Sequence, residues 1–437
     1  MSFNIVDFLL SLVDLTVFDY LRQVWGDAIW VEAVLDLIGV LTVSTFALLI
    51  VLLLIWLERK VIARIQDRIG PNRVGGRFGL LQTVADVIKL LTKEDITPTG
   101  ADRLAYNLAP ILIVISALLM WAVMPFAPGV IGVDLNIGVF YVLSISSVSV
   151  VCLLLAGWGS NNKYALLGAF RSVAQLVSYE IPMILSLLVP IILARTMSTE
   201  GIIAAQTIPY LFVVPLSAII FFISALAETG RSPFDLLEAE SEIVAGFHVE
   251  YGGMKFGMFF LAEFISTLFM SGFFVTIFLG GYRFFGVENL VIGEVAIGRL
   301  LAMIVFFVKM FAVYFIFIWI RGTLPRVRID QMLNINWKFL VPLSLVLIFT
   351  VAILDKVIIE LGVTGDVGRG LIHLASNVII AIVTLEILRR RARQQREAAS
   401  ETLLTKMAAS GGQSGGQSGG HHDGDPGHDD AVPAGAH

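Results

Sequence analysis

Long apolar stretches separated by short polar loops run along most of the chain. Nine of them are close to the roughly 20 residues that an α-helix needs to cross the hydrocarbon layer of a membrane. We expect spans at residues 35–57, 104–127, 138–157, 172–194, 209–228, 256–280, 297–320, 338–360 and 368–388. Backbone polar groups in a bilayer must be paired internally. The pattern therefore predicts an all-α fold, a polytopic membrane helix bundle of eight to nine transmembrane helices.

Residues 79–93 have a different pattern and are too short to span a membrane. Apolar residues such as Val84, Ile88 and Leu91 recur at helical spacing, while polar residues such as Asp86 fall mostly on the other face. This spacing predicts an amphipathic helix that lies along the cytoplasmic membrane surface.

The pattern divides the chain into four segments. They are an N-terminal extension at 1–34, a membrane domain at 35–361, an additional transmembrane helix with a basic end at 362–398, and a Gly/Ser/His/Asp-rich tail at 399–437. Aspartates interrupt the apolar positions of the extension, which favours an interfacial helix over a span. The composition of the tail predicts disorder, with its histidines solvated rather than bound to a metal.

Lysine and arginine gather in alternate loops. The basic loops are residues 58–103, 157–171, 226–255 and 321–338, together with the run 389–391 after the last span. The positive-inside rule places these loops and the C-terminus in the cytoplasm, and the N-terminus outside.

Composition agrees with a membrane protein and limits its chemistry. Hydrophobic residues make up 57% of the chain and charged residues 15%, against about 25% charged in soluble domains. A single cysteine, Cys152, rules out an internal disulfide framework, a four-cysteine zinc site and a self-contained iron–sulfur cluster. The chain has no glycine-rich nucleotide motif, and we expect neither a bound metal nor nucleic-acid binding. Any electrons would have to come from a partner.

Carboxylates are concentrated between Leu226 and Phe264, where apolar spans enter and leave the membrane. They are Glu228, Asp235, Glu238, Glu240, Glu242, Glu250 and Glu263. Carboxylates are costly in this setting and persist there mainly when they handle ions or protons. The density of charge predicts a proton relay that is not fully ionised. A solvated acidic loop that docks a basic partner is the alternative.

Glu180 and Glu58 are also candidates for the proton relay. Glu180 lies about eight residues into its span and is followed by Pro182, which predicts a helix break and a water-lined cavity. Glu58 closes the first span, where an ion pair with Arg59 or Arg64 is the structural alternative.

Glu263 lies at a depth similar to that of Glu180. Lys255, about two helical turns away, is a weak charge partner for it. A purely structural buried pair is the alternative to a proton-handling role.

Four blocks in the basic loops match one family in order. They are ERKVIARIQDRIGPNRVGGRFGLLQTVADVIKLLTKE (58–94), GWGSNNKYALLGAFRSVAQLVSYEIP (157–182), LAETGRSPFDLLEAESEIVAGFHVEYGG (226–253) and WIRGTLPRVRIDQ (319–331). Together they resemble the quinone-site membrane subunits of respiratory complex I from bacteria and mitochondria. The resemblance runs from about Leu35 to Leu361.

The resemblance implies a part in proton-pumping NADH:quinone oxidoreductase, with quinone as the substrate. It implies a carboxylate path that couples quinone reduction to proton translocation, made of Glu58, Asp86, Glu180, Glu228, Asp235, Glu238, Glu240, Glu242, Glu250 and Glu263. It also implies a quinone-binding group, made of Arg59, Lys60, Arg64, Arg68 and Phe247. The arginines have a second explanation, because basic residues at these positions also fix the orientation of the spans.

The implied partners carry the redox chemistry. The family has a peripheral redox arm on the cytoplasmic side, which holds FMN and iron–sulfur clusters, and antiporter-like membrane subunits that move ions. The chain itself would bind no cofactor, and its location would be the bacterial plasma membrane.

Three other functions are compatible with parts of this pattern. The same core occurs in membrane-bound hydrogenases and related dehydrogenases with another electron donor. A proton-coupled secondary transporter would use similar carboxylates, although the chain shows no convincing internal repeat. A structural anchor for the peripheral arm would not explain glutamates deep in spans.

Overall fold

The computed structural model describes residues 11, 16–25, 28–235, 244–284, 286, 297–362 and 365–411. The helices follow in the order α2 (Val17–Trp25), α3 (Ile29–Ile65), α4 (Gln82–Thr92), α5 (Arg103–Leu119), η1 (Met120–Val123), α6 (Gly138–Gly159), α7 (Lys163–Ala194), α8 (Thr199–Ala205), α9 (Tyr210–Val213), α10 (Pro215–Glu228), α11 (Gly253–Phe278), α12 (Ile297–Thr323), α13 (Ile329–Ile335), η3 (Asn336–Leu340), α14 (Val341–Glu360) and α15 (Asp366–Gly411). Among these residues, those up to Ile380 form one compact unit and those from Ala381 to Gly411 a second.

Eight helical segments in the described part of the chain are long and apolar enough to cross a membrane. They are Ile29–Ile65, Arg103–Val123, Gly138–Gly159, Lys163–Ala194, Gly253–Phe278, Ile297–Thr323, Ile329–Glu360 and Val367–Gln394. The predicted all-α polytopic bundle is confirmed.

The predicted span at 209–228 is not one helix. It consists of α9 and α10, separated at Val214. The 14 residues of α10 reach about 21 Å, less than the roughly 30 Å of a hydrocarbon layer. Pro215 begins α10, since proline has no N–H to donate and fits the first helical turn. This segment is therefore a short apolar helix within the bundle.

Helix α3 is longer than the predicted first span at both ends. It begins at Ile29 rather than residue 35, and it continues through the basic stretch to Ile65. An ion pair of 3.0 Å between Arg22 Nε and Glu32 Oε1 joins α2 to the first turn of α3. Because the helix continues past residue 57, Glu58 occupies a defined helical face.

The predicted surface helix is present as α4, which starts at Gln82, three residues later than expected. It packs against α3 and α11. The predicted break at Pro182 is absent, because α7 continues through both Pro182 and Pro190 to Ala194. Neighbouring helices pack along α7 and hold it in place despite the missing backbone donors.

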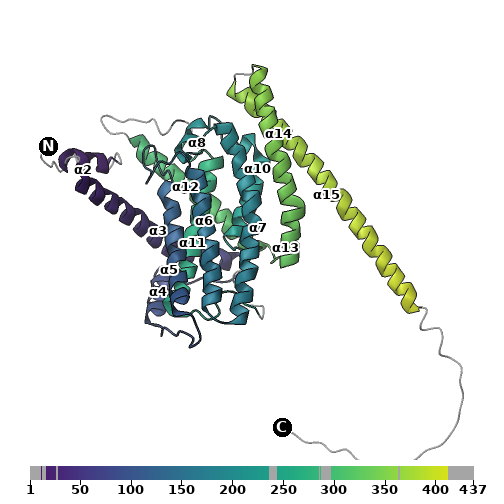
Figure 1. The fold of residues 1–437 in the computed structure, drawn as a ribbon, viewed down its shortest axis with the longest axis horizontal. Coiled ribbons are helices and arrows are strands. Elements are labelled where there is room, and N and C mark those ends of the chain that lie inside the picture. The colour runs from purple at the N-terminus through teal and green to yellow at the C-terminus, as the bar shows by residue number, and fades with distance from the viewer. Residues whose placement is uncertain are drawn as a thin grey trace, which may run out of the picture. The chain divides into compact units, whose positions relative to one another are not determined.

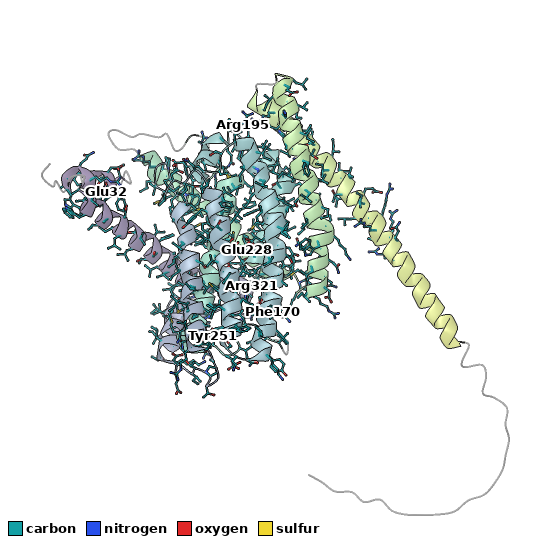
Figure 2. All side chains as sticks on the ribbon, viewed as in Figure 1. Glu32, Phe170, Arg195, Glu228, Tyr251 and Arg321 are labelled. Carbon is teal, nitrogen blue, oxygen red and sulfur yellow. The ribbon has the colours of Figure 1, made fainter. Side chains whose placement is uncertain are left out.

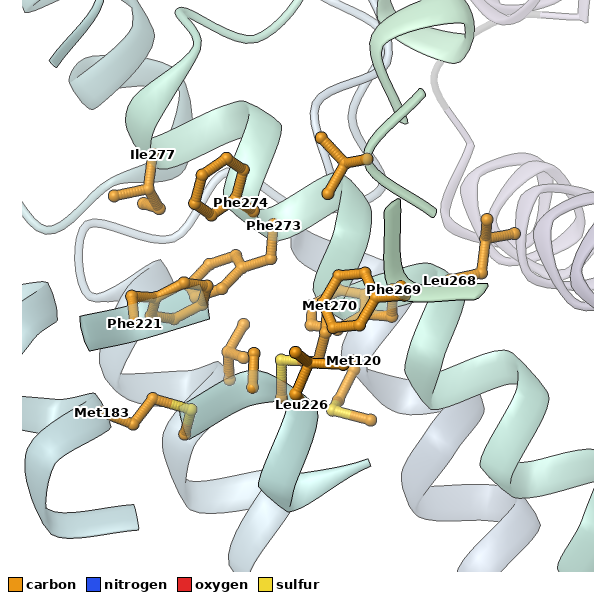
Figure 3. Close-up of a cluster of buried hydrophobic side chains, with 14 of the residues drawn as sticks. Met120, Met183, Phe221, Leu226, Leu268, Phe269, Met270, Phe273, Phe274 and Ile277 are labelled. Atoms are coloured by element: carbon orange, nitrogen blue, oxygen red, sulfur yellow. The ribbon is translucent and has the colours of Figure 1, made fainter. Parts of the chain in front are cut away.

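The core is built around α11. Figure 1 shows α5, α6, α7 and α11 running side by side, and α11 packs against α5, α3, α10 and α12. Its inward side chains include Phe269, Phe273 and Phe278, all almost fully buried. Figure 3 shows Phe269 and Phe273 in one buried cluster with Phe221 of α10 and Met183 of α7. Aromatic packing of this density fixes the positions of the polar side chains on the same helices.

Candidate functional site: a buried carboxylate and arginine cluster

Glu58 lies at the centre of a buried ion cluster. Arg231 Nη1 donates to both of its carboxylate oxygens, at 2.9 Å and 3.0 Å. Arg321, in the last turn of α12, contacts the same carboxylate. Arg231 Nε lies 3.1 Å from Glu263 Oε1 of α11. Two carboxylates and two guanidinium groups from three helices and one loop thus form a charge-balanced cluster.

Burial makes this cluster an interior feature. The side chains of Arg231 and Glu58 are only 3% and 7% exposed. The Arg231 guanidinium also stacks over the Phe264 ring, with its central carbon 4.3 Å from the ring centroid. Burial lowers the pKa of Arg231, but the charges of Glu58 and Glu263 outweigh that effect, and the net shift is upward. Arg231 therefore remains cationic and can serve two carboxylates.

The loop that carries Arg231 is fixed by a buried amide. Gln175 Nε2 of α7 donates to the carbonyl oxygens of Ala227 and Phe234, at 2.6 Å and 2.7 Å. The backbone N–H of Val327 donates to the carbonyl oxygen of Pro233 at 2.9 Å. These bonds hold both ends of the segment 227–234, so the position of Arg231 is set by the helix bundle.

Glu180 and Glu228 form a second group of acidic side chains. The Ser147 hydroxyl of α6 donates to Glu180, and Ser147 also bonds the carbonyl oxygen of Leu143. The charges of Glu180 and Glu228 interact with one another. Glu228 lies three positions before Arg231, so the same segment contributes to this acidic group and to the cluster around Glu58. In Figure 2, Glu228 and Arg321 lie between Tyr251 near one end of the bundle and Arg195 at the other.

Asp86 is paired with Arg59 across the contact between α4 and α3. Gln82 Nε2 also donates to the Asp86 carboxylate, at 3.4 Å. Trp56 Nε1 donates to the carbonyl oxygen of Phe78 at 2.9 Å, which ties the chain before α4 to α3. Arg59 and Asp86 therefore position the surface helix.

The remaining predicted basic residues have other surroundings. Arg64 and Arg68 are exposed, and Lys60 is half-buried. Arg68 Nε donates to Gln66 Oε1 at 2.7 Å. Phe247 is buried against Phe259, with ring centroids 5.0 Å apart.

Glu250 lies at the basic end of the bundle. Asn162 Nδ2 donates to its carboxylate at 2.6 Å, and both residues line a groove of about 850 Å³. Tyr251 stacks on Tyr106 with ring centroids 4.2 Å apart. Burial raises the pKa of Tyr251, which keeps its hydroxyl protonated at neutral pH. This hydroxyl donates to the carbonyl oxygen of Tyr106 at 3.1 Å.

Several pairings differ from those expected from the sequence. Glu58 pairs with Arg231 and Arg321 rather than with Arg59 or Arg64. Lys255 pairs with Asp95 at 3.0 Å rather than with Glu263.

The predicted acidic segment after Glu228 is described only as far as Asp235. Asp235 Oδ2 lies 3.3 Å from Arg326 Nη2. Glu238, Glu240 and Glu242 lie outside the described residues.

The sequence did not identify Arg231, Arg321 or Gln175 as part of the site. In the sequence the two arginines look like charges that only fix the orientation of the spans, since both fall in basic stretches between apolar segments. Their one distinguishing signal is position, because each lies within a few residues of the end of an apolar helix. Gln175 carries a clearer signal as an amide inside an apolar span, where an unpaired polar group is costly.

This fold and site define a multi-pass α-helical membrane protein with a charged interior at one end of its bundle. A family model described as NADH dehydrogenase matches residues 38–352. The chain is 50% identical over 301 residues to the H subunit of the NADH-quinone oxidoreductase of Dehalococcoides mccartyi strain CBDB1, which covers 69% of this chain and 81% of the relative. It is 44% identical over 326 residues to the protein of the same name from Bacteroides thetaiotaomicron, covering 74% and 90%. For the protein of that name from Geobacillus kaustophilus, identity is 47% over 298 residues, covering 68% and 86%.

The match spans more than half of the chain and most of each relative. The chain belongs to the NADH dehydrogenase family.

Proposed function

We propose that this chain, a membrane subunit of NADH:quinone oxidoreductase, forms part of the quinone-binding chamber and the first segment of a proton path. The observation that carries the proposal is the buried cluster of Glu58, Arg231, Glu263 and Arg321. A desolvated charge cluster is costly to maintain for stability alone. Ionisable residues inside membrane proteins commonly mark ion or proton pathways.

The shared guanidinium of Arg231 supplies a switching element. It contacts Glu58 through Nη1 and Glu263 through Nε, so a proton gained by one carboxylate strengthens the pairing with the other. Reduction of a quinone to a quinol consumes two electrons and two protons. A change of charge near the loop 227–234 would be transmitted through Arg231 to α3 and α11.

Glu228 and Glu180 extend the path into the bundle. Glu228 is the last residue of α10, three positions before Arg231, and its charge interacts with that of Glu180. Ser147 supplies a hydroxyl at Glu180 that can both donate and accept a hydrogen bond. Glu238, Glu240 and Glu242 continue the acidic segment in sequence, and we assign them to the part of the path that faces the quinone.

The quinone head group would meet the basic residues around α4. Arg64 and Arg68 are exposed and Lys60 is half-buried, whereas Arg59 is paired with Asp86 and sets the position of α4. Phe247 packs against Phe259 of α11 and would shape the wall of the chamber. The isoprenoid tail would remain in the lipid.

The partner subunits and the orientation in the membrane follow from the same assignment. The peripheral arm, with FMN and iron–sulfur clusters, would dock on the end with the basic loops, and antiporter-like subunits would receive the charge change from the bundle. Charge asymmetry supports a cytoplasmic position for the basic loops and the C-terminus, with the N-terminus outside the bacterial plasma membrane.

The test is NADH-driven quinone reduction together with the membrane potential it generates, in membrane vesicles from a deletion strain and its complemented partner. Both signals should disappear on deletion and return on complementation. NADH oxidation that persists unchanged in the deletion vesicles would contradict the assignment and favour a complex with hydrogen, formate or another reduced carrier as donor, or a secondary transporter.

A further inference from the structure

A second charged cluster lies at the end of the bundle opposite the basic loops. Asp355 of α14 is buried and pairs with Arg369 of α15, whose Nε donates to Oδ1 at 2.7 Å. Arg195, the cap residue of α7, places Nη2 4.0 Å from Asp355 Oδ2. Asp355, Arg369 and the rest of α15 follow residue 352, where the family match ends. Two of the three charged residues of this cluster therefore lie outside the family match, and Arg195 lies inside it.

The side chain of His373 is buried in the same place and has unused hydrogen-bonding capacity. It is fully buried, and its Nε2 lies 3.6 Å from Asp355 Oδ1, beyond hydrogen-bond distance. Neither ring nitrogen has a hydrogen-bond partner within the described part of the chain. An imidazole N–H buried without a partner is costly, which indicates that a polar group approaches it.

A small pocket lies next to His373. It has a volume of about 60 Å³, and its polar lining comes from Arg369, His373, Thr207 and Tyr210. On the same measure one water needs about 10–15 Å³, so the pocket has room for a group the size of a phosphate. Arg369 lines the pocket, and Arg195 and Asp355 lie beside it; these three residues together carry one net positive charge when His373 is neutral. The chemistry of the pocket therefore favours a monoanion.

The pocket has the surroundings of a lipid headgroup site. It lies near the ends of α7 and α15, at the level where spans leave the membrane. Figure 2 shows Arg195 at this end of the bundle. The following turns of α15 expose Leu371, Val378 and Ile379, which provide an apolar surface for acyl chains.

We propose that the pocket formed by Arg369 and His373 binds the phosphate group of an anionic phospholipid, with Arg195 as an exposed second cation. Arginine recognises phosphate through its planar set of N–H donors, and the buried imidazole N–H adds a neutral donor. The bound lipid would hold the first turns of α15 against α7, α8 and α9.

The test is native mass spectrometry of the assembled, detergent-purified complex titrated with phosphatidylglycerol, phosphatidylcholine or inorganic phosphate. His373→Phe fills the pocket without changing charge, and Arg195→Gln removes the exposed cation. Lys356→Gln is the matched control, because it removes an exposed positive charge from the same end of α14 without lining the pocket. Each pocket variant should bind one phosphatidylglycerol fewer than wild type, or bind it at least ten-fold more weakly, while the control matches wild type.

Four outcomes would overturn the proposal. They are unchanged phosphatidylglycerol binding in both variants, equal binding of phosphatidylcholine at this site, an equal loss in the control, and occupation by inorganic phosphate with no preference for lipid. If His373→Phe prevents assembly, Arg195→Gln decides between these outcomes, because Arg195 is exposed and its loss leaves Asp355 paired with Arg369.

Discussion

Arg231 and Glu58 are separated by 173 residues in the chain, yet they form an ion pair in which both side chains are almost fully buried. The Arg231 guanidinium donates to both oxygens of Glu58 and also reaches Glu263. A loop residue thereby joins α3 to α11 electrostatically, at the end of the bundle that carries the basic loops.

Replacing Arg231 should therefore be severe. Arg231→Ala removes one of the two guanidinium groups that contact Glu58, together with the contact between Arg231 and Glu263. Removing one partner of a buried ion pair costs about 3–5 kcal/mol. Arg231→Lys should retain part of this stability but not the simultaneous contact with two carboxylates. The amount of assembled complex and its thermal midpoint measure the first effect, and quinone-reductase turnover measures the second. Wild-type turnover in Arg231→Lys would contradict a bridging role.

The Asp235–Arg326 pair should behave differently. The side chains of Asp235 and Arg326 are 22% and 26% exposed, so the pair is partly solvated. Partly solvated pairs contribute about 0–1 kcal/mol. Asp235→Asn and Arg326→Gln should each shift the thermal midpoint of the complex far less than Arg231→Ala. A loss as large as that of Arg231→Ala would show that Asp235 belongs to the buried cluster.

Gln175 provides a test of loop positioning. Gln175→Leu removes the hydrogen bonds to the carbonyl oxygens of Ala227 and Phe234, each worth about 1 kcal/mol. Gln206→Leu is a matched control, since Gln206 Nε2 donates to the carbonyl oxygens of Thr276 and Ile277 at the other end of the bundle. Both variants should lose similar thermal stability, but Gln175→Leu alone should lower turnover, by about ten-fold, which corresponds to about 1.4 kcal/mol. Equal turnover in the two variants would show that the position of the loop 227–234 does not affect quinone reduction.

Ser147 should matter through Glu180. Ser147→Ala removes the hydroxyl that donates to Glu180, and hydrogen bonds to charged groups are worth about 1.5–3 kcal/mol. Ser144→Ala is the control, because Ser144 lies on the same helix and bonds the carbonyl oxygen of Phe140. We expect turnover to fall about ten-fold in Ser147→Ala and to stay near wild type in Ser144→Ala. The steady-state rate of NADH-driven quinone reduction measures both, and equal rates would remove Ser147 from the path.

The fold was largely predictable because hydrophobic length is a strong signal in membrane proteins. The long spans and the surface helix α4 followed from the pattern of apolar positions. Three predictions failed for physical reasons. Helix α7 continues through Pro182 because its neighbours hold it, and α3 continues past residue 57 because charged residues also form helices. The predicted span at 209–228 is divided at Val214, where Pro215 begins α10.

The site was predictable only in part. Glu58, Glu180, Glu228 and Glu263 stood out because carboxylates are rare in apolar spans. Their partners were not predictable, since Arg231 and Glu58 are far apart in sequence and meet only through the packing of α3 against α11 and α12. Sequence spacing identifies only local neighbours of Glu58 such as Arg59, and in the structure Arg59 pairs with Asp86 instead.

The most direct test of the account is the assembled complex with Glu180→Gln, reconstituted in liposomes and supplied with NADH and quinone. Glu200→Gln on α8, at the opposite end of the bundle, is the control. The account predicts normal assembly of both variants, with quinone reduction and membrane potential reduced at least ten-fold in Glu180→Gln only. Wild-type turnover and potential in an assembled Glu180→Gln complex would contradict a proton path through this carboxylate, and a complex that fails to assemble would assign Glu180 a structural role.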